Sequence, residues 1–310
     1  MNLFNQVEDA KPFLKWAGGK TQLIPSIHAA LPKDFSDIKD LTYIEPFIGS
    51  AAVMFWFLRS FPNVKKAVIN DINKDLTDAY KTIRDNPKEI IHCLEEVQKK
   101  YYSLQTEEER RDYFLEQREL FNTRKIKAIK NTCLLIFLNR TCFNGLYRVN
   151  SKNEFNVPFG KYINPKICDK ETILADSKLL QKVIILNGDY EESLSHATQN
   201  TFFYFDPPYK PISTTASFNS YAKDCFDDAE QIRLKKFCEK ISDKGYFWLL
   251  SNSDLKNIDI TDNFFDDLYS DYSINRVKAK RNINSNGSKR GEIFELLISN
   301  YEKKPAVFSY

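Results

Sequence analysis

The chain has 310 residues, 42% of them hydrophobic and 14% aromatic, and a formal net charge of +3. This composition excludes a disordered chain, and the length suits one large domain or a domain with a sizeable insertion. No apolar run approaches the roughly 18 residues that span a bilayer, and the first residues lack the basic-then-apolar order of a signal peptide. We therefore expect a cytoplasmic protein without a membrane partner, while the net charge is too small to demonstrate a nucleic-acid partner.

Strands and helices alternate along the first part of the chain. A glycine turn leads into an amphipathic helix that ends before Pro32, and an apolar strand then runs into the turn Pro46-Phe47-Ile48-Gly49. A helix, a strand and a second helix follow at 51–59, 67–70 and 74–84. This order of elements favours a parallel sheet.

The chain changes character after residue 86. Residues 87–137 are charged and helical in pattern, and residues 140–165 carry the Asn, Gly, Pro and alternating aromatic residues of an extended hairpin or loop. Residues 140–170 contain six basic and two acidic residues, and residues 275–291 contain six basic residues and no acidic one. Both runs suit contact with a phosphate backbone, and a solvated face is the alternative for each. We expect an inserted unit at 87–171.

Sheet patterns return in the second half of the chain. Strands are expected at 183–186, 201–205, 246–250, 273–280 and 293–301, with a helix around 228–241. The last two strands are expected to pair antiparallel. The whole pattern predicts a mixed α/β fold.

The strand at 201–205 runs directly into Asp206-Pro207-Pro208-Tyr209. Pro207 lacks a backbone N–H and fixes φ, so the Asp206 carboxylate is held at the carboxyl edge of the sheet, where ligands bind in open α/β folds. A carboxylate and a carbonyl can accept both hydrogens of an exocyclic amine, and the Tyr209 ring offers a face for a planar base. The pattern indicates chemistry on a nucleobase, with a plain strand-terminating turn as the alternative.

Two acids and a glycine indicate a nucleoside site at the same edge. Gly49 allows a ligand to approach the backbone, and Asp71 follows the second strand. In doubly wound folds, an acid about 20 residues after the glycine turn accepts hydrogen bonds from ribose hydroxyls. Asp71 could instead be the N-cap of the helix at 74–84. Asp189, after the strand at 183–186, could accept a hydrogen bond from an adenine amine.

A phosphate-binding P-loop is a poor explanation for Gly18-Gly19-Lys20-Thr21, because Leu14 stands where that motif needs its first glycine. Lys20 beside Trp16 better suits a carboxylate and a planar group. The six cysteines form no C-x-x-C pair and have no neighbouring histidine pattern. We therefore expect free thiols and no metal site.

Four motifs taken in this order resemble those of the Dam-type DNA adenine methyltransferases, and the resemblance covers nearly the whole chain. They are Trp16-Ala17-Gly18-Gly19-Lys20, Glu45-Pro46-Phe47-Ile48-Gly49, Asn70-Asp71-Ile72-Asn73 and Asp206-Pro207-Pro208-Tyr209. Residues 142–150 and 154–162 resemble the recognition hairpin of the Dpn-type, GATC-specific branch that belongs to restriction–modification systems.

The resemblance implies a Rossmann-like, doubly wound, S-adenosylmethionine-dependent methyltransferase sheet. Residues 1–86 and 172–310 would form the catalytic domain, and residues 87–171 an inserted helical and hairpin domain for DNA recognition. The cofactor would be S-adenosylmethionine, released as S-adenosylhomocysteine, without a metal. The expected catalytic residues are Asp206, Pro207, Pro208 and Tyr209. The expected cofactor-binding residues are Trp16, Lys20, Glu45, Pro46, Phe47, Gly49, Asp71, Asp189 and Asp206. The expected DNA-binding residues are Phe143, Asn144, Leu146, Arg148 and Pro158.

The resemblance further implies methylation of adenine N6 in double-stranded DNA, within GATC, by a monomer of bacterial or phage origin. Arg148 suits a bidentate contact to a guanine in the major groove. The product would protect DNA from a separately acting cognate restriction endonuclease or mark it epigenetically. Three other interpretations stay open: an RNA or protein methyltransferase, a cytosine N4-methyltransferase, and a DNA-binding module without catalysis.

Overall fold

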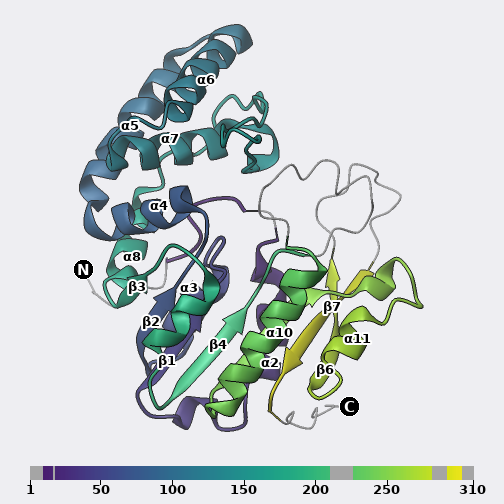
Figure 1. The fold of residues 1–310 in the computed structure, drawn as a ribbon. Coiled ribbons are helices and arrows are strands. Elements are labelled where there is room, and N and C mark those ends of the chain that lie inside the picture. Colours follow the sequence, from purple (N-terminus) through teal and green to yellow (C-terminus); the bar gives the residue numbers. More distant parts are fainter. Residues whose placement is uncertain (1–9, 17, 210–225, 281–291, 302–310) are drawn as a thin grey trace, which may run out of the picture.

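The computed structural model of the protein describes residues 10–16, 18–209, 226–280 and 292–301. These residues form a seven-stranded sheet with the strand order β3-β2-β1-β4-β5-β7-β6 (Figure 1). The strands are β1 (Leu41–Glu45), β2 (Val64–Ile69), β3 (Val183–Ile185), β4 (Thr201–Phe205), β5 (Phe247–Ser253), β6 (Ser273–Lys280) and β7 (Glu292–Ser299). The first five are parallel, whereas β7 is antiparallel to both β5 and β6. The predicted mixed α/β, Rossmann-like fold is therefore confirmed.

The central strands are apolar because both faces of the sheet are covered. Every residue of β1 and β4 is buried, which is typical of parallel strands between two layers of helices. Along β4, Phe202 and Tyr204 pack into one hydrophobic cluster, and Phe203 and Phe205 pack into a second cluster on the opposite face. The run of aromatic residues in this strand thus fills two cores at once.

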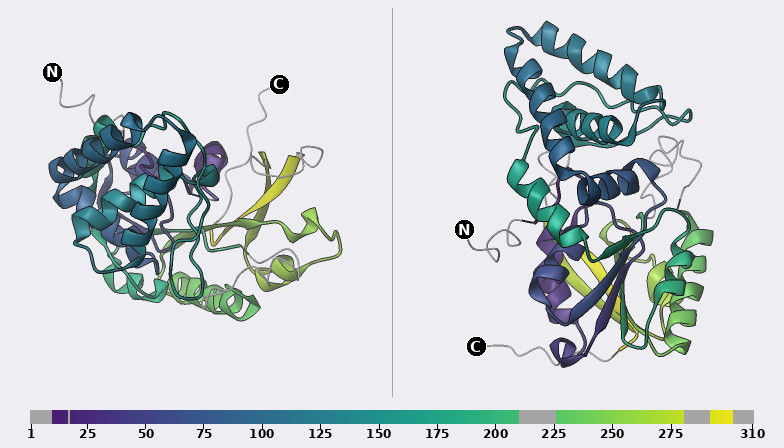
Figure 2. Two further views of the ribbon diagram at one scale, coloured as in Figure 1. Left: turned by 90° about the horizontal axis from the view of Figure 1, so that it is seen from above. Right: turned by 90° about the vertical axis from the view of Figure 1, so that its left-hand side faces the viewer.

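Helices cover the two faces of the sheet (Figure 2). One face packs against α2 (Ile24–Ala30) and α3 (Ala52–Ser60), and the other packs against α10 (Asp228–Asp243) and α11 (Phe264–Leu268). Short 3-10 helices complete these layers: η1 (Lys20–Leu23), η2 (Phe35–Asp37), η4 (Tyr190–His196) and η5 (Leu255–Asn257). None of the helices within the described ranges is long and apolar enough to cross a membrane.

The charged middle region of the sequence forms a separate group of helices. Figure 1 shows it beyond the edge of the sheet toward which β4 points. Its helices are α5 (Pro87–Ser103), α6 (Glu107–Asn122) and α7 (Ala128–Thr141). Helices α4 (Lys74–Asp85) and α8 (Lys170–Leu180) lie between this group and the sheet (Figure 1), and α4 packs against α7. The side chains from Thr132 to Asn139 in α7 are buried without interruption, because α5, α6 and α4 surround this helix.

The segment from 142 to 160 is an irregular hairpin, as its Asn, Gly and Pro residues predicted. Isolated bridges pair Cys142 with Phe159 and Val149 with Phe155, and η3 (Phe143–Gly145) forms one turn between them. Helix α8 follows and was not among the predicted helices. Its start carries a recognisable signal, since the side chain of Asp169 accepts a hydrogen bond from the backbone of Thr172.

Candidate active site

A cavity of about 950 Å³ opens at the carboxyl ends of the central strands. Strand β1 lies between β2 and β4, so the strand order reverses beside it, and ligands of open α/β sheets bind at such a point. All the residues that the sequence assigned to catalysis and cofactor binding line this cavity. They are Trp16, Lys20, Glu45, Pro46, Phe47, Gly49, Asp71, Asp189, Asp206, Pro207, Pro208 and Tyr209. The fold therefore gathers into one site residues that are far apart in the sequence.

Asp206 is the first residue after the buried strand β4, and two side chains hold its carboxylate. The Nζ atom of Lys20 lies 2.8 Å from Asp206 Oδ1, and the hydroxyl of Ser251 on β5 donates to the same oxygen at 3.1 Å. The Lys20 side chain is only 4% exposed, so this ion pair is shielded from water. Burial raises the pKa of Asp206, and the charge of Lys20 opposes part of that rise.

Tyr209 is held by Lys20 and by an acid that the sequence analysis missed. Lys20 Nζ lies 4.4 Å from the centroid of the Tyr209 ring and covers one face of it. The Tyr209 hydroxyl donates to Glu295 Oε2 at 2.8 Å, and the same oxygen lies 3.8 Å from Lys20 Nζ. Burial raises the pKa of Glu295. The available signal was a single acid within the apolar strand at 293–298.

Asp71 is oriented toward the cavity by backbone donors. Its Oδ2 accepts from the backbone of Gly49 at 3.2 Å, and its Oδ1 accepts from the backbone of Asn73 at 2.9 Å. The N-cap of α4 is Asn73, whose side chain accepts from Leu76, so the N-cap interpretation of Asp71 is wrong. Gly49 has a φ of +45°, and a Cβ there would lie 3.2 Å from the Trp16 ring, which explains the need for glycine.

Asn70 supplies a buried polar atom without a partner among the described residues. Its amide nitrogen donates to the backbone oxygens of Pro46 and Gly188, at 3.2 and 3.0 Å. Its Oδ1 is buried and accepts no hydrogen bond from the described residues, and Asn70 is one of the residues that line the cavity. An unsatisfied acceptor of this kind costs free energy unless a ligand or water donates to it. Asn70 Oδ1 is therefore a candidate acceptor for a hydrogen-bond donor of a ligand.

Asp189 lies in a network of charges at another part of the cavity wall. Its Oδ1 accepts from Arg233 at 2.7 Å and from the backbone of Glu191 at 2.9 Å. Arg233, on α10, also pairs with Glu191 and Glu230, and its guanidinium lies 4.6 Å from the centroid of the Tyr190 ring. Asp189, the predicted adenine-binding acid, thus forms an ion pair with Arg233, which the sequence analysis did not identify.

Aromatic rings give the cavity flat apolar walls. The Phe47 ring centroid lies 5.1 Å from that of Tyr190 and 5.5 Å from that of Phe226. Trp16 also lines the cavity, and its indole stacks on Tyr147 at 5.2 Å with an angle of 23° between the planes. Walls of this kind suit planar, partly apolar groups such as nucleobases.

Glu45 is a fully buried acid at the end of β1. Its Oε2 accepts a hydrogen bond from the Tyr43 hydroxyl at 2.6 Å. Burial raises the pKa of Glu45 well above its ordinary range, and the Tyr43 hydrogen bond offsets only part of this rise. The folded protein therefore binds the Glu45 proton more tightly than the unfolded chain does.

This shift predicts how pH affects the stability of the ligand-free protein. Because the folded-state pKa is raised, the contribution of Glu45 is fully present below the ordinary carboxyl pKa of about 4.3 and is lost as pH rises through the folded value. Glu45→Gln should therefore reduce the fall in Tm between about pH 5 and about pH 8. Thermal melts of wild type and Glu45→Gln test this, with exposed Glu116→Gln as the control. Parallel Tm curves for wild type and Glu45→Gln would refute it.

The five predicted DNA-binding residues lie outside the cavity, on the hairpin at 142–160. They are Phe143, Asn144, Leu146, Arg148 and Pro158. Phe143 is 53% exposed, and its backbone N–H donates to the carbonyl of Pro158 at 2.8 Å, which places these two residues side by side. The exposed Arg148 donates through Nε to Asn156 Oδ1 at 2.7 Å, whereas Leu146 is half-buried. The hairpin thus presents most of them to solvent.

Part of the positive charge counted in the sequence is buried or paired with acids of the protein itself. Arg140 donates to the backbone oxygen of Phe13 at 2.8 Å, and burial lowers its pKa. Lys161 and Lys166 form ion pairs of 2.8 Å with Glu107 and Asp169. In the second basic run, Arg276 pairs with Asp254 and Asp266, and positions 281–291 lie outside the described residues. Counting charges therefore overestimated the basic surface.

The cysteines and acids of the described residues show no metal-binding arrangement. Cys93, Cys133, Cys142, Cys168 and Cys238 are free thiols, and Cys225 falls in a part of the chain that is not described. Among the described ranges, no group of three or more His, Cys, Asp or Glu side chains could hold a metal ion.

Comparison with known proteins identifies the class. Residues 16–283 match the family described as D12 class N6 adenine-specific DNA methyltransferase. The chain belongs to this family, as its resemblance to the Dam-type enzymes predicted.

Individual relatives are similar over almost the whole chain. The Type II methyltransferase M.MjaIII of Methanocaldococcus jannaschii is 46% identical over 94% of this chain and 100% of its own length. The Type II methyltransferase M1.LlaDCHI of Lactococcus lactis subsp. cremoris is 36% identical, with 97% and 99% covered. The DNA adenine methylase of Vibrio cholerae is 34% identical, with 93% and 95% covered.

Proposed function

We propose that this protein transfers the methyl group of S-adenosylmethionine to N6 of adenine in double-stranded DNA, within GATC sites. The family membership supports the reaction class. The observation that supports the site is the shielded pair of Lys20 and Asp206 at the end of β4, next to Pro207 and Tyr209. The hairpin motifs support the recognition sequence.

The residues present fit S-adenosylmethionine. When bound, this cofactor supplies an electrophilic methyl group on a sulfonium. Asp71 would accept hydrogen bonds from ribose hydroxyls, and Lys20 would pair with the carboxylate of the methionine part. The unpartnered Asn70 Oδ1 can accept one further hydrogen bond, and Asp189 can accept one from the adenine amine. The remaining wall of the cofactor site would be made by Trp16, Glu45, Pro46, Phe47 and Gly49.

Asp206 and the Pro207 carbonyl would act on the target amine. The lone pair of adenine N6 is delocalised into the ring, so the amine is a poor nucleophile. Two acceptors that take its hydrogens favour a pyramidal nitrogen with a localised lone pair. Methylation forms an N–C bond, breaks the S–C bond and releases one proton from N6. The raised pKa of Asp206 makes its carboxylate a better acceptor for that proton.

The target base has to leave the duplex, which costs a few kcal/mol. Lys20 covers one face of Tyr209, so the base would stack on the opposite face and recover part of this cost. The exposed Phe143 ring would fill the space in the opened duplex. Arg148 would bind a guanine, and Asn144, Leu146 and Pro158 would contact neighbouring base edges.

We assign the chain to two functional parts. Residues 1–86 and 172–310 would carry the cofactor and target-base sites, and residues 87–171 would recognise DNA. The relatives named Type II methyltransferases support a role beside a cognate restriction endonuclease. The relatives named DNA adenine methylases support epigenetic marking as a second role. In either role the protein would act as a cytoplasmic monomer.

Methyl transfer from labelled S-adenosylmethionine tests the proposal. Two duplexes that differ only in a GATC or a scrambled site are compared, and the product nucleosides are analysed. We expect label in 6-methyladenine from the GATC duplex alone. Label in both duplexes would refute GATC specificity, and label in cytosine would refute the target atom. No label despite intact DNA binding would refute catalysis by this site.

A further inference from the structure

One residue of the hairpin contacts the cavity wall directly. Tyr147 lies between Leu146 and Arg148, two of the residues proposed to read DNA. Its ring stacks on Trp16, which lines the cavity. Trp16 in turn lies against Gly49, where a Cβ would come within 3.2 Å of the indole. A single stack of rings thus joins the hairpin to the proposed cofactor site.

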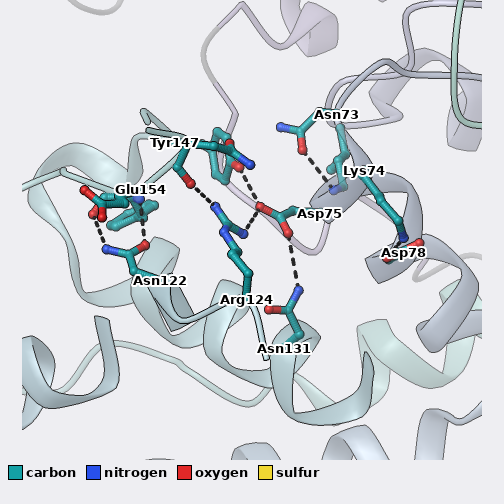
Figure 3. Close-up of polar contacts among 12 residues, drawn as sticks. Asn73, Lys74, Asp75, Asp78, Asn122, Arg124, Asn131, Tyr147 and Glu154 are labelled. Atoms are coloured by element: carbon teal, nitrogen blue, oxygen red, sulfur yellow. Dashed lines mark hydrogen bonds and ion pairs between the residues drawn. The ribbon is translucent and has the colours of Figure 1, made fainter. Parts of the chain in front are cut away.

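The Tyr147 hydroxyl makes a second connection. It donates to Asp75 Oδ2 at 2.8 Å (Figure 3). Asp75 also accepts from Arg124, through the same oxygen, and from Asn131 at 3.4 Å. Asp75 stands in the first turn of α4, shortly after Asn73, which lines the cavity. The hairpin, α4 and the start of α7 therefore meet at one carboxylate.

Arg124 extends this connection to the tip of the hairpin. It lies between α6 and α7 with a φ of +56°, a left-handed conformation that is unusual for arginine. Its guanidinium pairs with Asp75 and also donates to the backbone oxygen of Asn153 at 2.6 Å. The unusual backbone conformation thus accompanies contacts to two different parts of the structure.

A separate buried contact fixes the segment that carries Trp16. Asn139, at the end of α7, accepts from the backbone N–H of Lys15 at 2.8 Å and donates to its carbonyl at 2.9 Å. The same amide donates to the carbonyl of Gly145 at 2.8 Å. A Cβ at Gly145 would lie 2.4 Å from the Lys15 side chain, so the two segments are in close contact. Movement of the hairpin would therefore move Trp16.

We propose that Tyr147 and Asp75 are positioning residues that couple occupancy of the cofactor cavity to DNA binding by the hairpin. This inference rests on the proposed function. A ligand seated against Trp16 restrains the indole, and the ring stack with the Asp75 hydrogen bond restrains the hairpin. Binding of the first ligand then reduces the conformational entropy that the protein loses when the second ligand binds. By linkage, each ligand raises the affinity of the other by the same factor.

The coupling factor can be measured without turnover. Fluorescence anisotropy gives the Kd for a GATC duplex with and without saturating S-adenosylhomocysteine, and the ratio of the two values is the factor. For wild type we expect a factor of about 5 to 150. Tyr147→Phe keeps the ring stack but loses the hydrogen bond to Asp75, so its factor should be about 2- to 12-fold smaller. Asp75→Asn should reduce the factor as well, and Tyr147→Ala should bring it close to one.

A matched control removes a tyrosine hydroxyl from another position among the helices, on α5. The Tyr102 hydroxyl donates to the backbone oxygen of Pro165 at 2.8 Å, away from Trp16, so Tyr102→Phe should keep the wild-type factor. Wild-type factors in both Tyr147→Phe and Tyr147→Ala would overturn the inference. So would a wild-type factor of one with both ligands bound, and the proposed function would survive that result. A wild-type protein that bound neither ligand would overturn both.

Discussion

Asp206→Asn is expected to lower kcat for methyl transfer by about 10² to 10³-fold, a loss typical of removing one preorganised electrostatic contact. The amide keeps the size of the side chain and one acceptor oxygen. It loses the negative charge that polarises N6 and takes up its proton, and it places an NH₂ group near Lys20, where the carboxylate now lies 2.8 Å from the cation. Chemistry should therefore suffer more than folding.

Single-turnover transfer to a saturating GATC duplex measures this loss without interference from product release. Asp78→Asn is a suitable control, since it neutralises an acid on the outer side of α4 that pairs with Lys74. Thermal melts establish that Asp206→Asn is folded. Transfer within threefold of wild type would exclude Asp206 from the chemical step.

Lys20→Met is expected to weaken cofactor binding by about 30-fold or more, equivalent to ~2 kcal/mol or more for loss of one partner of a buried charge pair. The variant removes the cation proposed to hold the cofactor carboxylate. It also leaves Asp206 and Glu295 close together without the charge that lies between them, and it removes the group that covers one face of Tyr209. Both affinity and the shape of the target-base site should change.

The same variant should show a distinct dependence of stability on pH. Burial already raises the pKa of Asp206 and of Glu295, and loss of the neighbouring cation raises both further. A raised folded-state pKa means stability that is present at low pH and lost as pH rises, so Lys20→Met should be more destabilised at about pH 8 than at about pH 5. Calorimetric titration with S-adenosylhomocysteine and thermal melts test the two effects, with exposed Lys33→Met as control. Unchanged affinity would remove Lys20 from the cofactor site.

The sequence predicted the sheet well because its strands are continuous apolar or aromatic runs that end in acids, glycines or prolines. The strand at 201–205 and the antiparallel pair at the end of the chain were placed nearly at their observed bounds. The acids, glycines and prolines after the strands also identified the cavity residues, because parallel strands bring their carboxyl ends to one edge of the sheet. Helix α8 was missed, although Asp169 and Thr172 carry its N-terminal signal.

The partners of the site residues could not be predicted, because they depend on which strands become neighbours. Glu295 reaches Tyr209 because β7 inserts between β5 and β6, against the order of the chain. Arg233 reaches Asp189 from the helix after a long connection. Arg140 appeared as a surface charge, but a carbonyl of the amino-terminal segment takes its hydrogen bond. Local patterns contain no information on such pairings.

The position of β7 also makes the site depend on contacts between residues that are far apart in the sequence. Trp16 lies near the beginning of the chain and Glu295 near its end, yet both contact the same site. Contacts between such distant positions close late, because the loop entropy has to be lost before they form. Until β7 folds, β5 lacks its antiparallel neighbour and Tyr209 lacks its acceptor Glu295. The hydrogen bond that holds Tyr209 therefore forms only once β7 has paired with β5.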